Sequence, residues 1–258
     1  MKSKRVAIAI IGGSGVYGAE RLEGQTRIEM ETPYGESFLT VGDFKDKRIA
    51  FIARHGEKHS IPPHKINYRA NIHALAQLGV RRIISTCAVG SLRDDFEPGT
   101  IVLPDQFIDF TKKREHTFYD DEAVHVSMAD PFCPEMRELT SSIVNGLGYG
   151  LKEKATYFCI EGPRFSTKAE SKMFKQFADV IGMTLVPECQ LSREKAICYL
   201  CIAMVTDYDV YGEKPVTAVD VKKVMEENAK KVQKIIWKTI EKIPFERGCN
   251  CREALKEA

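Results

Sequence analysis

The sequence contains no run of about eighteen consecutive apolar residues, the length that a membrane-spanning helix requires. It also has no large excess of charge of one sign, since 38 basic and 36 acidic residues give a formal net charge of +2. That near-balance argues against a partner held by bulk charge, such as duplex DNA or an anionic membrane, but it allows a small anion at one focused site. The apolar run after the basic start breaks at Gly12 and Gly13, which favours a strand and a glycine loop over a signal peptide. We therefore expect a cytoplasmic globular protein without nucleic-acid or membrane partners.

Signatures of several other enzyme classes are missing or incomplete. There is no Gly-x-Ser-x-Gly elbow and no P-loop. Residues 13–18 match the G-x-G-x-x-G pattern of dinucleotide folds, but the chain that follows has too little room for the crossover helix, so an oxidoreductase is a weak alternative. His55 and His59 have the i, i+4 spacing of metal ligands, but Gly56 and Pro62 oppose a helix there. We predict no metal ligand and no cofactor. The glycine loop after the first strand still exposes backbone N–H groups, which can hold an anion.

Cysteine is abundant, with eight residues, but no pair has the Cys-x-x-Cys spacing of a zinc knuckle. Six lie in or beside predicted elements, where we expect buried thiols acting as small hydrophobic groups. Cys249 and Cys251 lie instead in a polar tail, residues 245–258, where a redox pair, a disulfide and a metal clip all stay open. A disulfide between Cys133 and Cys198 is a further hypothesis.

Apolar periodicity predicts one α/β domain, residues 1–258, with strands and helices alternating around a mixed sheet. The last helix begins at Thr217 as N-cap with Asp220 at the third helical position, and its apolar face runs from Val221 to Ile240. The other predicted elements are strands at 5–11, 82–86, 100–104, 156–160, 179–182 and 197–206, a hairpin at 37–53, and helices at 67–79, 135–147, 168–177 and 187–195.

Polar side chains that suit anion and base binding follow several of these strands, where α/β sheets bind ligands. Anion donors, carboxylates and apolar contacts occur there together, and such a set suits displacement by phosphate. The residues are Ser14, Arg54, His55, the loop at Cys87 and Ala88, Phe165, Met183, Thr184, Asp207, Tyr208 and Asp209.

Taken in order, the sequence resembles the methylthioadenosine-cleaving group of the trimeric purine nucleoside phosphorylase family. The resemblance runs from about residue 6 to 244, and its most specific segments are Ile-Glu-Gly-Pro-Arg-Phe-Ser-Thr (160–167), Gly-Met-Thr-Leu-Val-Pro-Glu (182–188) and Ala-Met-Val-Thr-Asp-Tyr-Asp (203–209). Other matching segments are Ile-Gly-Gly-Ser-Gly (11–15), Ala-Arg-His-Gly (53–56) and Ala-Val-Gly-Ser-Leu (88–92). It implies a phosphorylase/hydrolase-like fold, with a mixed sheet closing towards a barrel, and a homo-oligomer, either a trimer or a dimer of trimers.

The resemblance also implies roles for residues. Phosphate, a co-substrate, is expected at Ser14, Arg54, His55, Thr184 and the backbone of Cys87 and Ala88, where some relatives have threonine in place of Cys87. Asp207 is expected to act as general acid on the purine N7. The remaining substrate contacts are expected from Phe165 and Ser166, Met183, Tyr208, Asp209, Ala218, Val221 and the neighbouring subunit's copy of His125.

The expected reaction is phosphate-dependent cleavage of S-methyl-5′-thioadenosine to adenine and 5-methylthioribose 1-phosphate. An acceptor pair at Asp207 and Asp209 fits a 6-aminopurine, and relatives selective for 6-oxopurines carry Asn at the first position and Glu at the position of Ser166. A protonated Asp207 can still donate to a 6-oxo group, so phosphorolysis of inosine, guanosine or methylthioinosine is the nearest alternative. A nucleoside-binding module without catalysis is a third.

Overall fold

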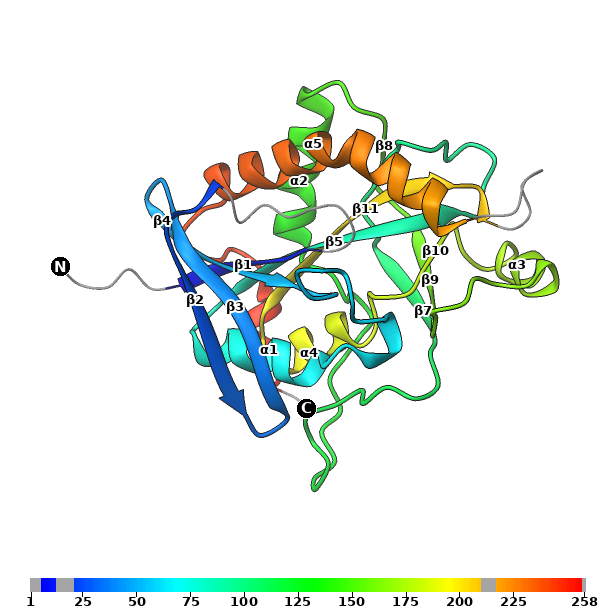
Figure 1. The fold of residues 1–258 in the computed structure, drawn as a ribbon. Coiled ribbons are helices and arrows are strands. Elements are labelled where there is room, and N and C mark those ends of the chain that lie inside the picture. Colours follow the sequence, from blue (N-terminus) through cyan, green and yellow to red (C-terminus); the bar gives the residue numbers. More distant parts are fainter. Residues whose placement is uncertain (1–5, 13–20, 210–216, 257–258) are drawn as a thin grey trace.

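The computed structural model describes residues 6–12, 21–209 and 217–256 (Figure 1). Its centre is an eleven-stranded mixed sheet, and eight strands follow one another in the order β2-β3-β4-β1-β5-β10-β9-β7. β11 pairs with β5 and β6, and β6 pairs in turn with β8. The strands are β1 (Val6–Gly12), β2 (Glu23–Thr32), β3 (Gly35–Phe44), β4 (Lys47–Ala53), β5 (Arg82–Ser91), β6 (Ile101–Val102), β7 (Gln106–Phe110), β8 (Leu151–Lys152), β9 (Thr156–Ile160), β10 (Val180–Gly182) and β11 (Cys198–Asp207).

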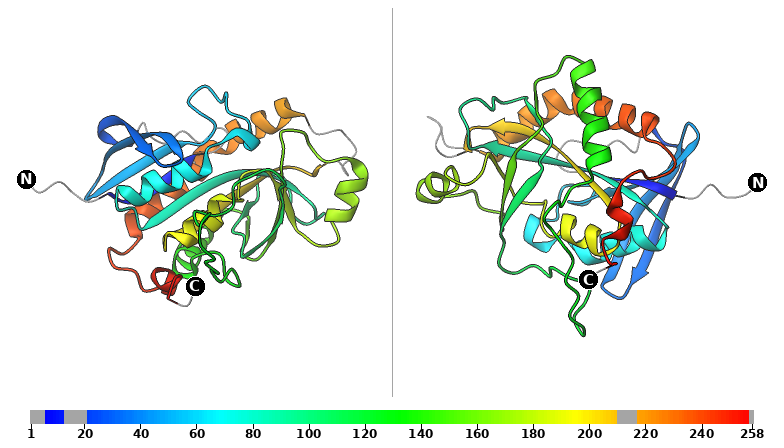
Figure 2. Two further views of the ribbon diagram at one scale, coloured as in Figure 1. Left: turned by 90° about the horizontal axis from the view of Figure 1, so that it is seen from below. Right: turned by 180° about the vertical axis from the view of Figure 1, so that it is seen from behind.

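Helices cover both faces of the sheet, as the three views in Figures 1 and 2 show. One face carries α2 (Pro134–Gly146) and α5 (Ala218–Lys242), and the other carries α1 (Tyr68–Gln77) and α4 (Glu188–Glu194). α3 (Lys168–Phe174) lies at the β7/β9 end, and two short 3₁₀ turns are η2 (Pro63–Lys65) and η4 (Asn250–Glu253). In β1, Ala9 and Ile11 face one core and Ile8 and Ile10 the other, because successive side chains of a strand point to opposite faces. The expected α/β class with a mixed sheet is confirmed.

β5 has two different neighbours along one of its edges. Its first half, Arg82 to Ser85, pairs in parallel with β1, and its end, Gly90 and Ser91, pairs antiparallel with β10. Its other edge pairs with β11 from Arg82 to Gly90. Between β1 and β10 the sheet therefore opens beside residues 86–89. The sequence predicted a strand ending at residue 86 and then a loop, and that prediction was wrong because pairing with β10 and β11 keeps the backbone extended to Ser91.

Most predicted elements are confirmed, including Thr217 as N-cap of α5, whose side chain accepts from the backbone N–H of Asp220. Three strands were missed, β2, β7 and the two-residue β8. β2 is charged and largely exposed, so its pattern lacks an apolar run, and β7 is half-buried. The polar tail is also not a free segment, because Cys249 and Cys251 are buried against α2, α5 and β11.

The six cysteines in or beside predicted elements are buried, as predicted, and Cys249 and Cys251 are buried as well; none of the eight forms a disulfide. The structure therefore contains no Cys133–Cys198 bridge, although these two thiols do lie close together. No helix within the described part of the chain is long and apolar enough to cross a bilayer.

Candidate active site

A cavity of about 1000 Å³ lies where the sheet opens beside β5. It is at the upper end of the range for small-molecule sites, roughly 300–1,000 Å³, which leaves room for two reactants at once. Twelve of the residues predicted from the sequence line it. They are Arg54, His55, Cys87, Ala88, Phe165, Ser166, Met183, Thr184, Asp207, Asp209, Ala218 and Val221.

Three predicted site residues are not placed in this cavity. Ser14 lies outside the described residues. Tyr208 is half-buried and does not line the wall, and His125 is exposed, on a segment away from the cavity. The prediction for His125 concerned a neighbouring subunit, so it stays a prediction.

Arg54 is fixed by a buried carboxylate that the sequence interpretation did not single out. Its Nε and Nη2 donate to Oε1 and Oε2 of Glu188, both at 2.7 Å, in a bidentate pair that excludes water. Nη2 also donates to Ser85 Oγ at 2.5 Å, and Nη1 donates to the carbonyl of Thr86 at 3.0 Å. Burial by itself would lower the pKa of Arg54, but the Glu188 carboxylate raises it well above the ordinary value, so the guanidinium is charged. Four of its five N–H groups are used by these bonds, which leaves one on Nη1 for a ligand.

His55 is neutral in this structure. Its Nδ1 lies 2.9 Å from the carbonyl oxygen of Ile61, which can only accept, so Nδ1 carries the hydrogen. Burial and the charge of Arg54 lower the pKa of His55 to about 4. Nε2 is therefore an acceptor. The sequence interpretation treated His55 as an anion donor, and that role stays a prediction; with Nδ1 bonded to Ile61, Nε2 is the ring nitrogen left for a ligand.

Cys87 and Thr184 face each other across the opening, with Sγ and Oγ1 3.3 Å apart. They meet because β10 runs antiparallel to the end of β5, so the chain after Gly182 returns beside residues 87–89. A hydrogen bond with the thiol of Cys201, and beyond it the charge of Arg54, lower the pKa of Cys87 to about 7 against the effect of burial. This wall of the cavity thus combines a charged guanidinium, a hydroxyl and a polarised thiol.

Asp207 reaches the cavity through a β-bulge near the end of β11. The register shifts between Val205 and Asp207, which re-aims the last side chain of the strand. Gly90 opposite leaves room for this side chain, because a Cβ on it would lie 3.0 Å from Asp207 Oδ1, a tight contact. Burial raises the pKa of Asp207, while the hydroxyl of Thr206 at 2.6 Å from Oδ2 and the N–H of Asp209 at 2.8 Å from Oδ1 oppose that rise. A raised carboxyl pKa is the property a general acid needs.

Asp209 is the second carboxylate and is 4 % exposed. Its backbone is in the left-handed region, with φ of 49°, which turns its N–H towards Asp207. Ser166 donates to it at 3.2 Å and Ser171 donates to Oδ2. These two hydroxyl groups fix the orientation of the Asp209 carboxylate beside Asp207. Each carboxylate oxygen can still accept a further hydrogen bond from a ligand.

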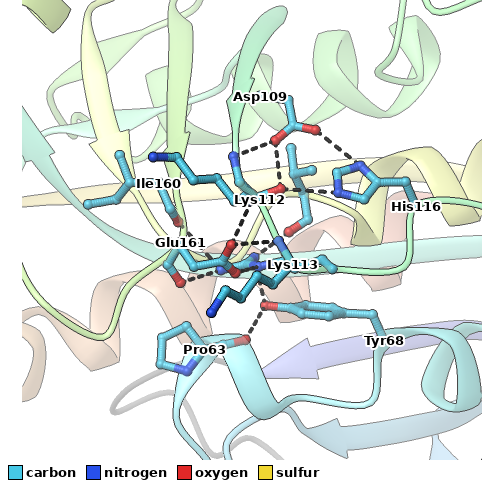
Figure 3. Close-up of polar contacts among 11 residues, drawn as sticks. Pro63, Tyr68, Asp109, Lys112, Lys113, His116, Ile160 and Glu161 are labelled. Carbon is cyan, nitrogen blue, oxygen red and sulfur yellow. Dashed lines mark hydrogen bonds and ion pairs between the residues drawn. The ribbon is translucent and has the colours of Figure 1, made fainter.

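The apolar wall rests on the segment after β9. Gly162 has φ of +65°, and a Cβ there would lie 2.6 Å from Met183 Sδ, so glycine lets this segment approach Met183. Glu161 anchors it, because Oε2 accepts from the backbone N–H groups of Lys112 and Lys113 at 2.6 and 3.0 Å (Figure 3). Arg114 donates to Glu161 Oε1 at 2.9 Å. This network fixes the entry of the segment that carries Phe165 and Ser166.

Several functional residues escaped the sequence interpretation. Glu188 had one usable signal, a carboxylate inside the apolar stretch Leu185–Cys189, where an unpaired charge is costly. Ser171 and Tyr199 had none, because each acts through a contact between two different elements, with Asp209 and Glu188. Thr206 had none either, because its bond to the adjacent Asp207 depends on how the two side chains are oriented.

Comparison with known proteins agrees with this fold. Residues 7–241 match the model of the Phosphorylase superfamily. The S-methyl-5′-thioadenosine phosphorylase of Thermofilum pendens is 57% identical over 99% of this chain and 99% of its own length. A crystal structure of a methylthioadenosine phosphorylase from an Antarctic soil metagenomic library has a TM-score of 0.90 and 43% identity, covering 99% of this chain and 93% of that one. The structure of the Schistosoma mansoni methylthioadenosine phosphorylase in complex with adenine has a TM-score of 0.92 and 33% identity, covering 97% of this chain and 96% of that one.

The chain therefore belongs to the phosphorylase superfamily, whose model spans nearly all of it. Within that superfamily, its relatives at 51–58% identity carry the name S-methyl-5′-thioadenosine phosphorylase. The family resemblance read from the sequence is confirmed.

Proposed function

We propose that this protein cleaves S-methyl-5′-thioadenosine with inorganic phosphate, giving adenine and 5-methylthioribose 1-phosphate. The observation that carries the proposal is one cavity with an anion-binding wall at Arg54, Thr184 and Cys87 and a buried carboxyl of raised pKa at Asp207. The identity to named methylthioadenosine phosphorylases supports the same substrate. Phosphate acts as co-substrate, and the chemistry calls for no cofactor.

Phosphate binds at the wall formed by Arg54, Thr184 and the backbone of Cys87 and Ala88. The guanidinium and the hydroxyl donate to phosphate oxygens. Because His55 presents an acceptor at Nε2, it suits the hydroxyl of a hydrogenphosphate dianion. The remaining oxygens face the ribose, where one attacks C1′.

The glycosidic bond breaks as the bond from phosphate oxygen to C1′ forms, with inversion at C1′. The sugar develops positive charge, which the phosphate dianion stabilises electrostatically. The departing purine takes the electron pair of the C1′–N9 bond, and Asp207 delivers a proton to N7. Burial supports this role, since it favours the protonated carboxyl.

Base choice follows from the two carboxyl groups. Asp207 and Asp209 offer acceptors to the 6-amino group of adenine, and Ser166 holds Asp209 in place. Phe165 packs on the purine, Met183 on the ribose, and Ala218 with Val221 forms the apolar pocket for the 5′-methylthio group. A homotrimer or dimer of trimers, with His125 reaching a neighbouring site, stays a prediction of the sequence, as does a cytoplasmic location.

The test is release of free base, followed by chromatography, from methylthioadenosine, adenosine, methylthioinosine and inosine, each with and without phosphate. We expect adenine release that requires phosphate and is fastest from the methylthio substrate. Faster release from the 6-oxo substrates would overturn the base assignment and favour the 6-oxopurine alternative. No release from any substrate would overturn the enzymatic proposal and leave a nucleoside-binding module.

A further inference from the structure

Four cysteine thiols gather at one point of the molecule, far from the cavity. The Sγ atoms of Cys133, Cys198, Cys249 and Cys251 all lie within 4.8 Å of one another, and all four residues are buried. Cys198 begins β11 and Asp207 ends it, so about 30 Å of extended strand separates the thiols from the proposed acid. The cluster is therefore independent of the proposed catalytic site.

The separations fit a tetrahedral set of metal ligands. Zinc–sulfur bonds of about 2.3 Å in a tetrahedron place sulfur atoms about 3.8 Å apart. The thiols here are mutually close, with Cys198 and Cys249 3.3 Å apart, so each has three sulfur neighbours. Two disulfide bonds would instead join each sulfur atom to a single partner at an S–S distance of about 2.05 Å. Four soft sulfur ligands with no carboxylate or histidine among them favour a thiophilic ion over magnesium or calcium.

Three separate segments are fixed so that their thiols converge. Cys133 is the N-cap of α2 and Cys249 the N-cap of η4, and neither side chain makes a capping hydrogen bond. Neither sulfur atom is used in a cap, so both are available to the cluster. Figure 2, in its view from behind, shows the red C-terminal turn against the start of yellow β11.

Arginine side chains hold the tail in that position. Arg82 donates from Nη2 to the carbonyl of Glu246 at 2.8 Å and from Nη1 to that of Phe245 at 3.3 Å. Arg247 donates to the carbonyl of Ala196 at 2.8 Å, and its Nη1 lies 3.9 Å from Cys198 Sγ. A guanidinium beside the sulfur compensates part of the negative charge that four thiolates around a divalent ion carry.

We propose that Cys133, Cys198, Cys249 and Cys251 form a structural zinc site that joins the C-terminal tail to α2 and β11. Binding replaces four S–H groups by four Zn–S bonds and releases four protons to solvent, with no change of oxidation state. With every position taken by sulfur, the ion has no open site for substrate, so it stabilises the fold and takes no part in phosphorolysis.

The test uses the full chain, expressed with added zinc and purified under reducing conditions without chelators. Zinc per chain is measured by plasma mass spectrometry in the wild type, in Cys251→Ser and in Cys189→Ser. Cys189 is a matched control, because it is also buried but lies outside the cluster, with its thiol 3.6 Å from the carbonyl of Pro131. We expect about one zinc per chain in the wild type and in the control, and at least about tenfold less in Cys251→Ser.

A second measurement needs no variant. Exchange of the wild-type metal for Co²⁺ should give the strong sulfur-to-cobalt charge-transfer bands and visible bands of a tetrahedral thiolate site. Wild-type protein without zinc would overturn the proposal, and a thiol count in denaturant without reductant would then separate disulfides, with four reactive thiols, from simple buried thiols, with eight. Full zinc in Cys251→Ser would overturn it as well. Base release by the wild type is measured separately, so failure here leaves the proposed enzymatic function untouched.

Discussion

Replacing Glu188 by glutamine tests the structural basis of the phosphate wall, because this carboxylate fixes Arg54. Glu188 Oε2 accepts three bonds at 2.7 Å, from Arg54 Nη2, Ser85 Oγ and Tyr199 Oη. Oε1 accepts from Arg54 Nε at 2.7 Å. The amide nitrogen of the glutamine cannot accept these bonds, so it will take the position of Oε1, where it faces one donor group, and not that of Oε2, where it would face three.

The variant then loses one charge-assisted hydrogen bond and leaves the Arg54 charge without its counterion in a fully buried position. Breaking a buried pair in this way costs about 3–5 kcal/mol. For a chain of this size each kcal/mol corresponds to roughly 2–4 °C in Tm, so we expect a fall of about 6–20 °C. Because the uncompensated guanidinium lies in the phosphate wall, saturating phosphate should raise the Tm of Glu188→Gln more than that of the wild type.

The assay is thermal unfolding with and without phosphate, and Glu241→Gln is the control. Glu241 pairs with Lys45 on the surface, where half of each side chain is exposed, so its loss should cost at most about 1 kcal/mol. A Tm for Glu188→Gln as close to the wild type as that of the control would refute the reasoning. An equal phosphate shift in variant and wild type would refute the link between Glu188 and the anion site.

Three further predictions concern the site and its support. The folded-state pKa of His55, about 4, lies below its unfolded value of about 6.5, so the unfolded chain binds the extra proton first. Stability should therefore fall by about 3 kcal/mol as the pH drops from 6.5 to 4, and denaturant titrations should show a smaller loss in His55→Asn. Gly182→Ala should fail to give folded protein, because its Cβ would lie 1.9 Å from the buried phenol oxygen of Tyr157, whereas Gly146→Ala, with open space around the new Cβ, should behave as wild type in expression and Tm. Val221→Thr should lower the preference for methylthioadenosine over adenosine by about tenfold in kcat/KM, because a hydroxyl replaces a methyl group in the 5′ pocket, and an unchanged ratio would remove Val221 from that pocket.

The sequence predicted the parts of the fold that follow from local patterning. The buried strands that became β1, β4 and β11 are continuous apolar runs, and Thr217 has the polar side chain of an N-cap. β2 could not be found, because its charged residues form a strand through pairing with β3. The extension of β5 to Ser91 likewise depends on β10, a strand about 90 residues later.

The site was predictable as a set of residues but not as a geometry. Motif order brought twelve cavity-lining residues together, yet it left Glu188 without a role, because a buried ion pair is defined by a contact across 134 residues of chain. The acceptor state of His55 depends on the carbonyl of Ile61, which no residue type reveals. The four-thiol cluster depends on the position of the tail, which the sequence left open between three chemistries.

The most direct test of the account is turnover of Asp207→Asn on methylthioadenosine and methylthioinosine with saturating phosphate. Thr206 and the N–H of Asp209 remain as partners for the new amide, so the variant should fold and bind substrate. Because asparagine has no proton to deliver to N7, we predict a loss of about 10²–10⁴ in kcat on methylthioadenosine, with the ratio of the two substrates shifting towards the 6-oxopurine. Unchanged turnover of methylthioadenosine would contradict the assignment of Asp207 as the general acid.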